Sequence, residues 1–367
     1  MRAARNARET VETAMRIQNL VVDGYERVVR AEDPARGFLG FVAVHDTTLG
    51  PALGGLRMWP YAHEREALAD VLRLAEAMTW KAAAAGLPLG GGKAVIVADS
   101  RNGKTRERLA AMAEVVEMLG GAYITAEDVG INAEDLTLMR AHTSHVTGLP
   151  REDGGSGDPA PFTALGVFES IKVCLAEALG NAAIKGRRFA IQGLGNVGTQ
   201  LARRLVEAGG NVVGADVCAE KAAAAAKALG IAVVDPGEIL YEQCDVLAPC
   251  ALGAVISEKS IPRLRAAVVA GAANNQLAET RDAARLKDRG ILYAPDFVIN
   301  AGGLINIAVE IEPAGYREEE AVRRVTAIAE TLGQVLARAR ETGTTPDRAA
   351  LALAEERIGQ MRAANHA

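Results

Sequence analysis

The chain is short of the residues and segments that mark several protein classes. Aromatic residues make up only 4% of its 367 residues, and 41 Lys and Arg are outnumbered by 46 Asp and Glu, so the formal net charge is −5. A slightly acidic chain lacks the basic surface that nucleic-acid binding requires. The low aromatic content argues against a binding module built on stacked rings. We therefore expect no nucleic-acid partner.

Disulfide bonds, membrane spans and a secretory signal are not expected either. The 4 cysteines include no Cys-x-x-Cys pair, and a chain of this length needs no disulfide to hold its fold. No apolar run reaches the ~18 residues of a membrane-spanning helix. The N-terminal segment contains Glu9 and Glu12 and no apolar stretch, so it predicts a frayed arm or helix start rather than a signal peptide. We expect a cytoplasmic protein without a membrane partner.

Glycine and apolar residues are abundant instead. The chain has 38 Gly and is 49% hydrophobic, which is enough to bury a large core. At roughly 150 residues per domain, its length predicts two domains. The segment 148–161, GLPREDGGSGDPAP, is a loop by its glycine, proline and charge content, and it is the best candidate for the domain junction.

Before the junction, the pattern mixes strands with helices. Apolar residues at helical spacing predict helices over 64–85 and 106–119, and short strands are expected at 37–46, 93–99 and 122–128. This part, residues 1–146, is predicted to form one α/β domain.

After the junction, short apolar strands alternate with helices, which is typical of a doubly wound parallel sheet. We predict this second domain over 147–344. From residue 315 on, two long amphipathic helices are expected, separated near 343–346, and the last helix, 345–367, is a candidate to pack on the first domain. The expected strands occupy residues 188–192, 211–216, 231–235, 244–249, 266–273 and 291–296, and the expected helices include 164–179 and 196–209.

A glycine-rich turn lies between the first strand and helix of this pattern. Its first glycine permits a tight turn, its second lets backbone approach a pyrophosphate, and its third allows close helix–strand packing. Asp216 ends the next strand, where a carboxylate accepts hydrogen bonds from ribose hydroxyls and repels a 2′-phosphate. The segment therefore predicts a Rossmann-type domain that binds NAD rather than NADP. The residues of the turn are Gly193, Leu194, Gly195, Asn196, Val197 and Gly198.

Two other kinds of site are not supported. The run 86–93 ends in GGGK, but Leu87 stands where a GxxxxGK phosphate-binding loop requires Gly, and Ala94 replaces its Ser or Thr. No metal site is expected, because the histidines show no ligand spacing with Cys or carboxylates beyond the single His-x-x-His at 142–145.

Two lysines and an aspartate in the first domain form a candidate proton-transfer group. Lys81 lies near the end of a predicted helix. Lys93 directly follows three glycines, which let backbone crowd against a ligand, so that the lysine is buried. A buried lysine has a lowered pKa and exchanges protons more readily near neutral pH. Asp128 closes a strand, where side chains commonly face a site. An isolated lysine is usually only a surface charge, so the combination carries the argument.

Several motifs in family order resemble the amino-acid dehydrogenases that act on glutamate, leucine, phenylalanine and valine. This resemblance implies a reversible NAD-dependent oxidative deamination of an L-amino acid to a 2-oxo acid and ammonium. The motifs occupy residues 50–58, 78–81, 89–93, 123–130, 248–254, 271–276 and 295–303.

The resemblance also implies roles for the matched residues. Lys81 is similar to the lysine that grips the substrate α-carboxylate, and Lys93 to the catalytic lysine that activates water and polarises the carbonyl. Asp128 matches the partner that handles the protons of the amino group. The backbone of Gly54 and Gly55 is implied to line the substrate site. Positions near the cofactor or the edge of the site are implied for Arg57, Thr163 and Asn274.

The residues implied to surround the substrate side chain are apolar. Leu53 stands where glutamate-specific relatives commonly carry a lysine, and an apolar lining does not compensate a second buried carboxylate. Without the resemblance, plain core packing would be the simpler explanation for such residues. The other residues of this set are Met78, Ala126, Leu304 and Ile307.

We therefore predict an amino-acid dehydrogenase for leucine, valine or isoleucine that forms a homo-oligomer. Two alternatives remain open: a phenylalanine dehydrogenase, and a non-catalytic relative that binds NAD or an amino acid. Ala160 and Ile131 stand where the family often has Ser and Thr, which leaves their effect on activity open.

Overall fold

The computed structural model describes residues 15–251 and 253–365. The predicted arm or helix start at the N-terminus and residue 252 of one family motif lie outside these ranges. By its packing, the chain divides into two compact units. Unit 1 comprises the described residues up to Thr47, Pro51–Glu76 and Gly92–Val146. Unit 2 comprises Thr48–Gly50, Ala77–Gly91 and the described part of Thr147–Ala367.

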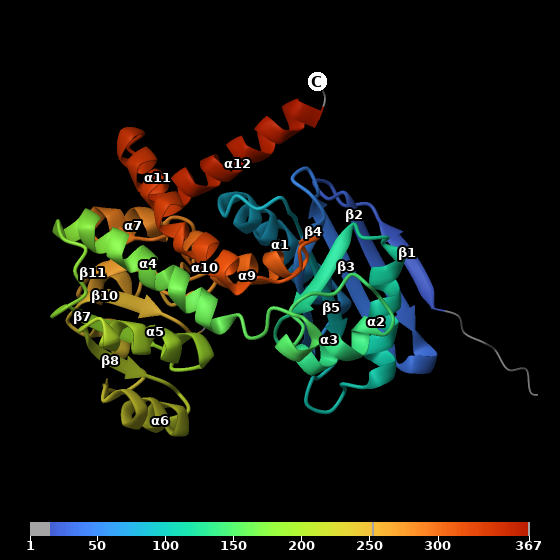
Figure 1. Cartoon of the computed structure of the whole chain (residues 1–367), viewed down its shortest axis with the longest axis horizontal. Coiled ribbons are helices and arrows are strands. Elements are labelled where there is room, and N and C mark those ends of the chain that lie inside the picture. Colours follow the sequence, from blue (N-terminus) through green and yellow to red (C-terminus); the bar gives the residue numbers. More distant parts are fainter. Residues whose placement is uncertain (1–14, 252, 366–367) are drawn as a thin grey trace, which may run out of the picture. The chain divides into compact units, whose positions relative to one another are not determined.

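Unit 1 is built on a 6-stranded mixed sheet in the order β1-β2-β3-β5-β4-β6 (Figure 1). β1, β2 and β3 pair antiparallel, and β4 pairs parallel with β6. The predicted strands match β3, β5 and β6 to within a few residues. β1, β2 and β4 are not predicted, because their short runs carry charges or glycines. The strands are β1 (Arg16–Leu20), β2 (Arg27–Asp33), β3 (Phe38–Asp46), β4 (Ala52–Trp59), β5 (Gly90–Val97) and β6 (Tyr123–Glu127).

The helices of this part are α1 (Glu64–Ala84), α2 (Arg106–Met118) and α3 (Ala133–Arg140). The first two match the predicted ranges to within one residue. Ala67, Val71 and Ala75 recur at the spacing of one helix face and join a core with Phe41 and Val95 of the sheet. α1 begins in unit 1, and its last residues, from Ala77 on, belong to unit 2.

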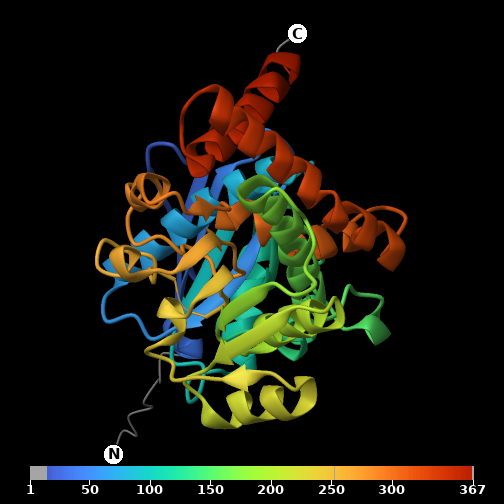
Figure 2. The ribbon, with the colours of Figure 1, turned by 90° about the vertical axis from the view of Figure 1, so that its left-hand side faces the viewer.

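Unit 2 contains a 6-stranded parallel sheet in the order β12-β11-β10-β7-β8-β9 (Figure 2). In chain order this is 3-2-1-4-5-6, the arrangement of a Rossmann fold. The predicted α/β class with a doubly wound sheet is therefore confirmed. The strands are β7 (Arg188–Gln192), β8 (Asn211–Ala215), β9 (Ala232–Val233), β10 (Cys244–Pro249), β11 (Ala266–Val269) and β12 (Leu292–Tyr293).

The sheet of unit 2 is buried on both faces. Phe189 and Ile191 of β7 belong to one hydrophobic core, and Ala190 between them belongs to another. Side chains alternate between the faces of a strand, so continuous apolar runs are what a doubly covered parallel sheet requires.

The helices of unit 2 include one departure from prediction. The first of the two long helices expected after residue 315 is interrupted at Ala327, so there are three helices, α10 (Glu318–Thr326), α11 (Ile328–Glu341) and α12 (Pro346–Asn365). The amphipathic pattern continues across the break, which is why periodicity did not reveal it. The others are α4 (Ala160–Leu179), α5 (Asn196–Glu207), α6 (Ala219–Leu229), α7 (Asp282–Asp288), α8 (Asp296–Ile299) and α9 (Gly302–Glu310).

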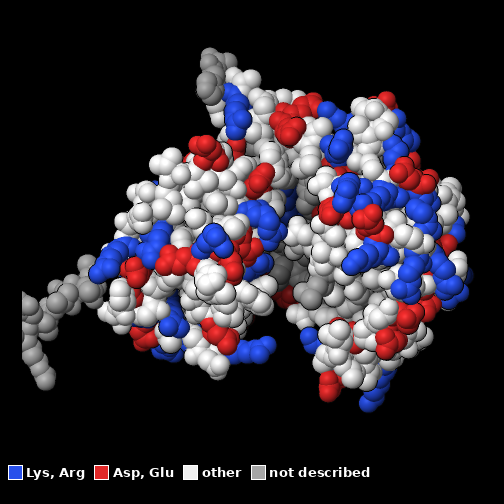
Figure 3. Space-filling model, turned by 180° about the vertical axis from the view of Figure 1, so that it is seen from behind, with Lys and Arg blue, Asp and Glu red and all other residues white. Residues whose placement is uncertain are grey.

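Positive and negative side chains are interspersed over the face shown in Figure 3. Within the described ranges, no helix is long and apolar enough to cross a membrane. The same ranges contain no group of three or more His, Cys, Asp or Glu side chains that could hold a metal ion.

Candidate functional site

Lys93 is a deeply buried lysine of unit 1. It lies on β5, and its side chain is only 6% exposed. There is no room for a side chain at the residue before it, because a Cβ on Gly92 would lie only 2.7 Å from the ring of Tyr123. Gly92 thus lets the strand that carries Lys93 pack against its neighbours.

Asp128 is the partner of this lysine. It follows β6, and its Oδ2 lies 3.0 Å from Lys93 Nζ. Gly55, on the neighbouring strand β4, makes the close approach possible, because a Cβ there would lie 2.8 Å from Asp128 Cβ. The predicted lysine–carboxylate pair is therefore present.

Arg57 extends this pair into a network. Its Nε donates to Asp128 Oδ2 at 2.9 Å and its Nη1 to Asp70 Oδ2 at 2.9 Å. Asp70, on α1, also accepts a hydrogen bond of 2.6 Å from the Tyr61 hydroxyl. The family resemblance implies a position for Arg57 near the cofactor or the edge of the substrate site, and the structure places it against these two carboxylates.

Burial and neighbouring charges together lower the pKa values of both Lys93 and Asp128. Burial lowers the pKa of Lys93, and the charge of Asp128 offsets only part of this effect. Burial by itself raises the pKa of Asp128, but Lys93 and Arg57 outweigh it, so this pKa lies below its usual value. The arrangement holds an ionised carboxylate beside a lysine that releases its proton more easily than a solvated one.

The other predicted site residues of unit 1 lie on the paired strands β4 and β6. Gly55 is paired with Ala126, and Leu53 with Ile124. The carbonyl oxygen of Gly54 accepts a hydrogen bond of 2.7 Å from the Tyr123 hydroxyl. Leu53 and Ala126 are buried within unit 1.

In unit 2, the glycine-rich turn joins β7 to α5, next to β10, where the order of the sheet reverses. Gly193 has a φ of +94°, and a Cβ on Gly198 would collide with the carbonyl oxygen of Gly193. A Cβ on Gly195, by contrast, would meet no atom within 4 Å. The first and third glycines are therefore required by the fold itself, and the second leaves open space above the backbone.

The open space at Gly195 fits a cofactor pyrophosphate. Gly195 caps α5 without a side-chain hydrogen bond, so the helix amides keep donors for an anion. The same turn contains Leu194, and α5 begins with Asn196 and Val197. Asp216 directly follows β8 and accepts hydrogen bonds of 2.8 Å from the backbone N–H groups of Leu194 and Cys218, which fix its carboxylate beside the turn.

Lys81 lies near the carboxyl end of α1, in the part of that helix that packs with unit 2. Its Nζ lies 3.4 Å from Oδ1 of Asn274, and the same oxygen accepts a hydrogen bond of 2.8 Å from Asn300 Nδ2. The structure therefore brings together two residues that sequence analysis assigned separately, to the substrate and to the cofactor.

The remaining predicted residues are distributed over three helices of unit 2. Met78 is on α1, three residues before Lys81, and Thr163 is in the first turn of α4. Leu304 and Ile307 lie three residues apart on α9, so they share one side of that helix. Leu304 is buried, and Met78 and Ile307 are partly exposed.

Three polar residues of these networks were missed by sequence analysis. Asp70 and Tyr61 had no signal of their own, because each is one polar residue on or beside an amphipathic helix. Asn300 did have a signal, since it lies in the family motif at 295–303. The structure adds that its Nδ2 donates hydrogen bonds to Oδ1 of Asn274 and to the carbonyl oxygen of Ala272.

Family models match both parts of the chain. The model described as Glu/Leu/Phe/Val dehydrogenase, dimerisation domain, matches residues 22–145. The model described as Glutamate/Leucine/Phenylalanine/Valine dehydrogenase matches residues 154–221 and 217–365.

Known proteins are similar over nearly the whole length. The chain is 46% identical over 338 residues to leucine dehydrogenase of Bacillus subtilis (strain 168), covering 92% of each chain. It is 44% identical over 340 residues to L-tryptophan dehydrogenase of Nostoc punctiforme (strain ATCC 29133 / PCC 73102), covering 92% of this chain and 95% of that protein. A crystal structure of L-tryptophan dehydrogenase from Nostoc punctiforme superposes with a TM-score of 0.80 at 42% identity, covering 92% of this chain and 97% of the other.

Proposed function

This chain belongs to the Glu/Leu/Phe/Val dehydrogenase family, and on that premise we propose that it oxidatively deaminates a branched-chain L-amino acid with NAD. The family predicted from the sequence motifs is confirmed, and with it the class of enzyme, an amino-acid dehydrogenase and oxidoreductase. Members of this family depend on a nicotinamide cofactor. The products are the 2-oxo acid, ammonium and NADH, and the reaction is reversible.

The observation that carries the proposal is the ion pair between Lys93 and Asp128. Asp128, kept ionised by Lys93 and Arg57, accepts a proton from the substrate amino group. When bound, the cofactor supplies the acceptor for the hydride of the α-carbon. Lys93 in its neutral form takes a proton from the water that attacks this carbon, and in its charged form it polarises the oxygen that results. Asp128 returns its proton to the nitrogen, the carbon–nitrogen bond breaks, and ammonia leaves as the carbonyl forms. Lys81 holds the α-carboxylate.

NAD is favoured over NADP by the environment of Asp216. Its carboxylate is held beside the turn by two backbone N–H groups, which leaves further lone pairs for the adenosine ribose hydroxyls. A 2′-phosphate at this place would face a fixed negative charge. Gly195 supports the pyrophosphate in this proposal because the space above it is open.

The side-chain specificity rests on the apolar set around Leu53, Met78, Ala126, Leu304 and Ile307. Among the five there is no cation to pair with a distal carboxylate, so glutamate is disfavoured. The aliphatic side chains of leucine, isoleucine and valine differ by one methylene or less, which changes the discrimination by apolar residues of this kind by only ~1–3 kcal/mol.

An aromatic L-amino acid is the second candidate. It is supported by the relative of 44% identity that is an L-tryptophan dehydrogenase. Leu304 and Ile307 are bulky, and on that ground we place phenylalanine and tryptophan after the branched-chain amino acids. A non-catalytic binding protein is the third, and the retained Lys81, Lys93 and Asp128 argue against it.

We also propose a homo-oligomer, because the family model that matches residues 22–145 is described as a dimerisation domain. A molar mass in light scattering at a multiple of the 38.4 kDa chain would support it. A mass equal to one chain at micromolar concentration would contradict it.

A substrate panel tests the proposed function. With NAD at alkaline pH, we expect NADH formation with L-leucine, L-valine or L-isoleucine and very little with L-glutamate. Lys93→Ala should abolish turnover, whereas Lys104→Ala, which removes another lysine–aspartate ion pair of unit 1, should leave it unchanged. Strong activity on glutamate, or an unchanged rate in Lys93→Ala, would overturn the proposal. NAD binding without turnover on any amino acid would support the non-catalytic alternative.

A further inference from the structure

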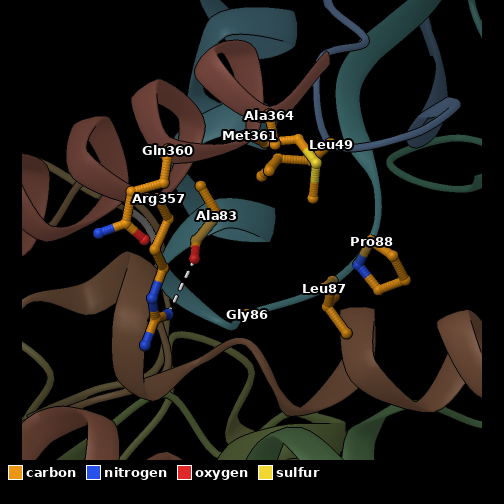
Figure 4. Close-up of a pocket in the computed structure, with 9 residues that line it drawn as sticks. All are labelled: Leu49, Ala83, Gly86, Leu87, Pro88, Arg357, Gln360, Met361 and Ala364. Atoms are coloured by element: carbon orange, nitrogen blue, oxygen red, sulfur yellow. Dashed lines mark hydrogen bonds between the residues drawn. The ribbon is translucent and has the colours of Figure 1, made fainter. Parts of the chain in front are cut away.

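The carboxyl end of α1 is held by an arginine that is distant in the sequence. Nη1 of Arg357, on α12, donates a hydrogen bond of 2.9 Å to the carbonyl oxygen of Ala83 (Figure 4). It donates a second one, of 2.6 Å, to the carbonyl oxygen of Ala84. All three residues belong to unit 2. The last carbonyl groups of a helix have no hydrogen-bond donor within the helix, so the side chain of Arg357 supplies one.

The positive charge of Arg357 also acts at the carboxyl end of α1. Among the described residues, no ion pair joins Arg357 to a carboxylate, and its guanidinium donates hydrogen bonds to the two carbonyl oxygens. A cation at the carboxyl end of a helix is stabilised by the helix dipole. Burial lowers the pKa of Arg357, and Glu356, its neighbour on α12, offsets only part of this. A guanidinium nevertheless stays charged in proteins.

These hydrogen bonds are partly buried. Arg357 lines a groove of about 380 Å³ together with Leu49, Leu87 and Met361, which Figure 4 shows around the loop that follows α1. Hydrogen bonds to a charged group are stronger where water is excluded. The contact is therefore more than a surface ion pair, which typically contributes little.

The held segment is the one that carries Lys81. The backbone N–H of Ala85 donates to the carbonyl oxygen of Lys81 at 3.0 Å, and that of Gly86 donates to Ala83 at 3.0 Å. Ala83 therefore accepts from both the loop and Arg357. Any movement of this last turn moves the backbone of Lys81, and with it the ammonium that contacts Asn274.

We propose that Arg357 is a positioning residue for Lys81, fixing the end of α1 so that the Lys81 ammonium stays in place for the substrate carboxylate. This inference rests on the carboxylate-binding role of Lys81 in the proposed function. The α-carboxylate is bound equally in the substrate and in the transition state. Loss of its contact with Lys81 therefore raises KM more than it lowers kcat.

Arg357→Met tests the proposal, since Met keeps much of the apolar stem and removes the donors. We expect KM for the amino acid to rise about tenfold, with kcat and KM for NAD changed less than about twofold. Arg357→Lys retains a charged donor and should fall between Arg357→Met and the wild type. Arg348→Met, at an exposed arginine of the same helix, is the matched control and should change none of these constants.

Hydrogen exchange followed by mass spectrometry supplies a readout that does not need activity. Peptides covering residues 81–88 should exchange faster in Arg357→Met than in the wild type and in Arg348→Met. Unchanged exchange would overturn the proposal, and so would faster exchange with an unchanged KM for the amino acid. An equal loss in all kinetic constants would also overturn it, because it would indicate a general structural defect.

The two proposals fail in different ways. A wild-type protein that oxidises no amino acid overturns the proposed function, and the exchange of residues 81–88 then still decides whether Arg357 holds the end of α1. Normal activity with an unaffected Arg357→Met overturns only the positioning role.

Discussion

At the scale of single residues, the charge around Lys93 is balanced by groups on several elements. Asp128 and Asp70 raise the pKa of this lysine, whereas burial, the largest cause, and Arg57 lower it. Arg57 contacts both carboxylates, so it also decides how much of their charge Lys93 experiences. Burial therefore has the largest effect on the proton affinity of the proposed catalytic lysine, and an arginine that need not contact the substrate lowers it further.

Arg57→Leu tests this arrangement through the pH dependence of kcat/KM. Removing the cation leaves the negative charges of Asp128 and Asp70 less compensated, so the pKa of Lys93 rises. A smaller share of Lys93 is then neutral at a given pH. We expect the ascending limb of the pH profile to move upward by roughly one pH unit. The profile is measured with saturating NAD.

Arg73→Leu is the control, because Arg73 also bonds Asp70 but is more exposed, at 53% of its side chain, and is not bonded to Asp128. Its profile should stay near that of the wild type. An ascending limb of Arg57→Leu that stays in place or moves to lower pH would contradict the assignment of this limb to Lys93.

At the scale of elements, the turn between β7 and α5 separates two kinds of glycine. A Cβ on Gly198 collides with the backbone of Gly193, whereas one on Gly195 meets nothing within 4 Å. Gly195 also has an ordinary φ of −72°, which any residue adopts. The two positions are thus a matched pair within one motif.

Gly195→Ala and Gly198→Ala should give opposite results. In Gly195→Ala we expect a normal melting temperature and a KM for NAD at least about tenfold higher, because the methyl group occupies the space proposed for the pyrophosphate. In Gly198→Ala we expect a loss of stability of about 1–3 kcal/mol from overpacking. Thermal unfolding and initial rates at varied NAD separate these outcomes. A Gly195→Ala protein with unchanged KM for NAD would contradict the proposed cofactor site.

At the scale of the whole molecule, cofactor binding is linked to stability. NAD at ~100 times its Kd stabilises the folded chain by about 2.7 kcal/mol. For a unit of this size we expect the melting temperature of the cofactor-binding part to rise by roughly 5–10 °C. NADP at the same concentration should give a clearly smaller shift, because Asp216 repels its 2′-phosphate.

Asp216→Asn is the variant that tests this reason. Its amide oxygen still accepts a backbone hydrogen bond at the turn, but the negative charge is lost. The shift produced by NADP should then approach that produced by NAD. Equal shifts by NAD and NADP in the wild type would contradict the predicted cofactor preference.

The sequence by itself determined the features that arise from neighbours along the chain. Strand–helix alternation after residue 160, the turn at Gly193–Gly198 and the helix that carries Lys81 are local patterns, and local patterns report on secondary structure and on glycine-dependent turns. The association of Lys93 with Asp128 was also predicted from the sequence, and the family motifs added the roles of the two residues. The break at Ala327 was missed because both helices present the same apolar periodicity.

Only the tertiary structure decided which distant residues meet. Arg57 lies 71 residues from Asp128 and 13 from Asp70, and Arg357 lies 274 residues from Ala83. Apolar periodicity shows which face of an element is buried but does not say which element covers it. A hydrogen bond requires a distance near 3 Å and a narrow range of angles, so it depends on the final packing of those elements. The network around Asp128 and the support of Lys81 by Arg357 therefore emerge only when the chain is folded.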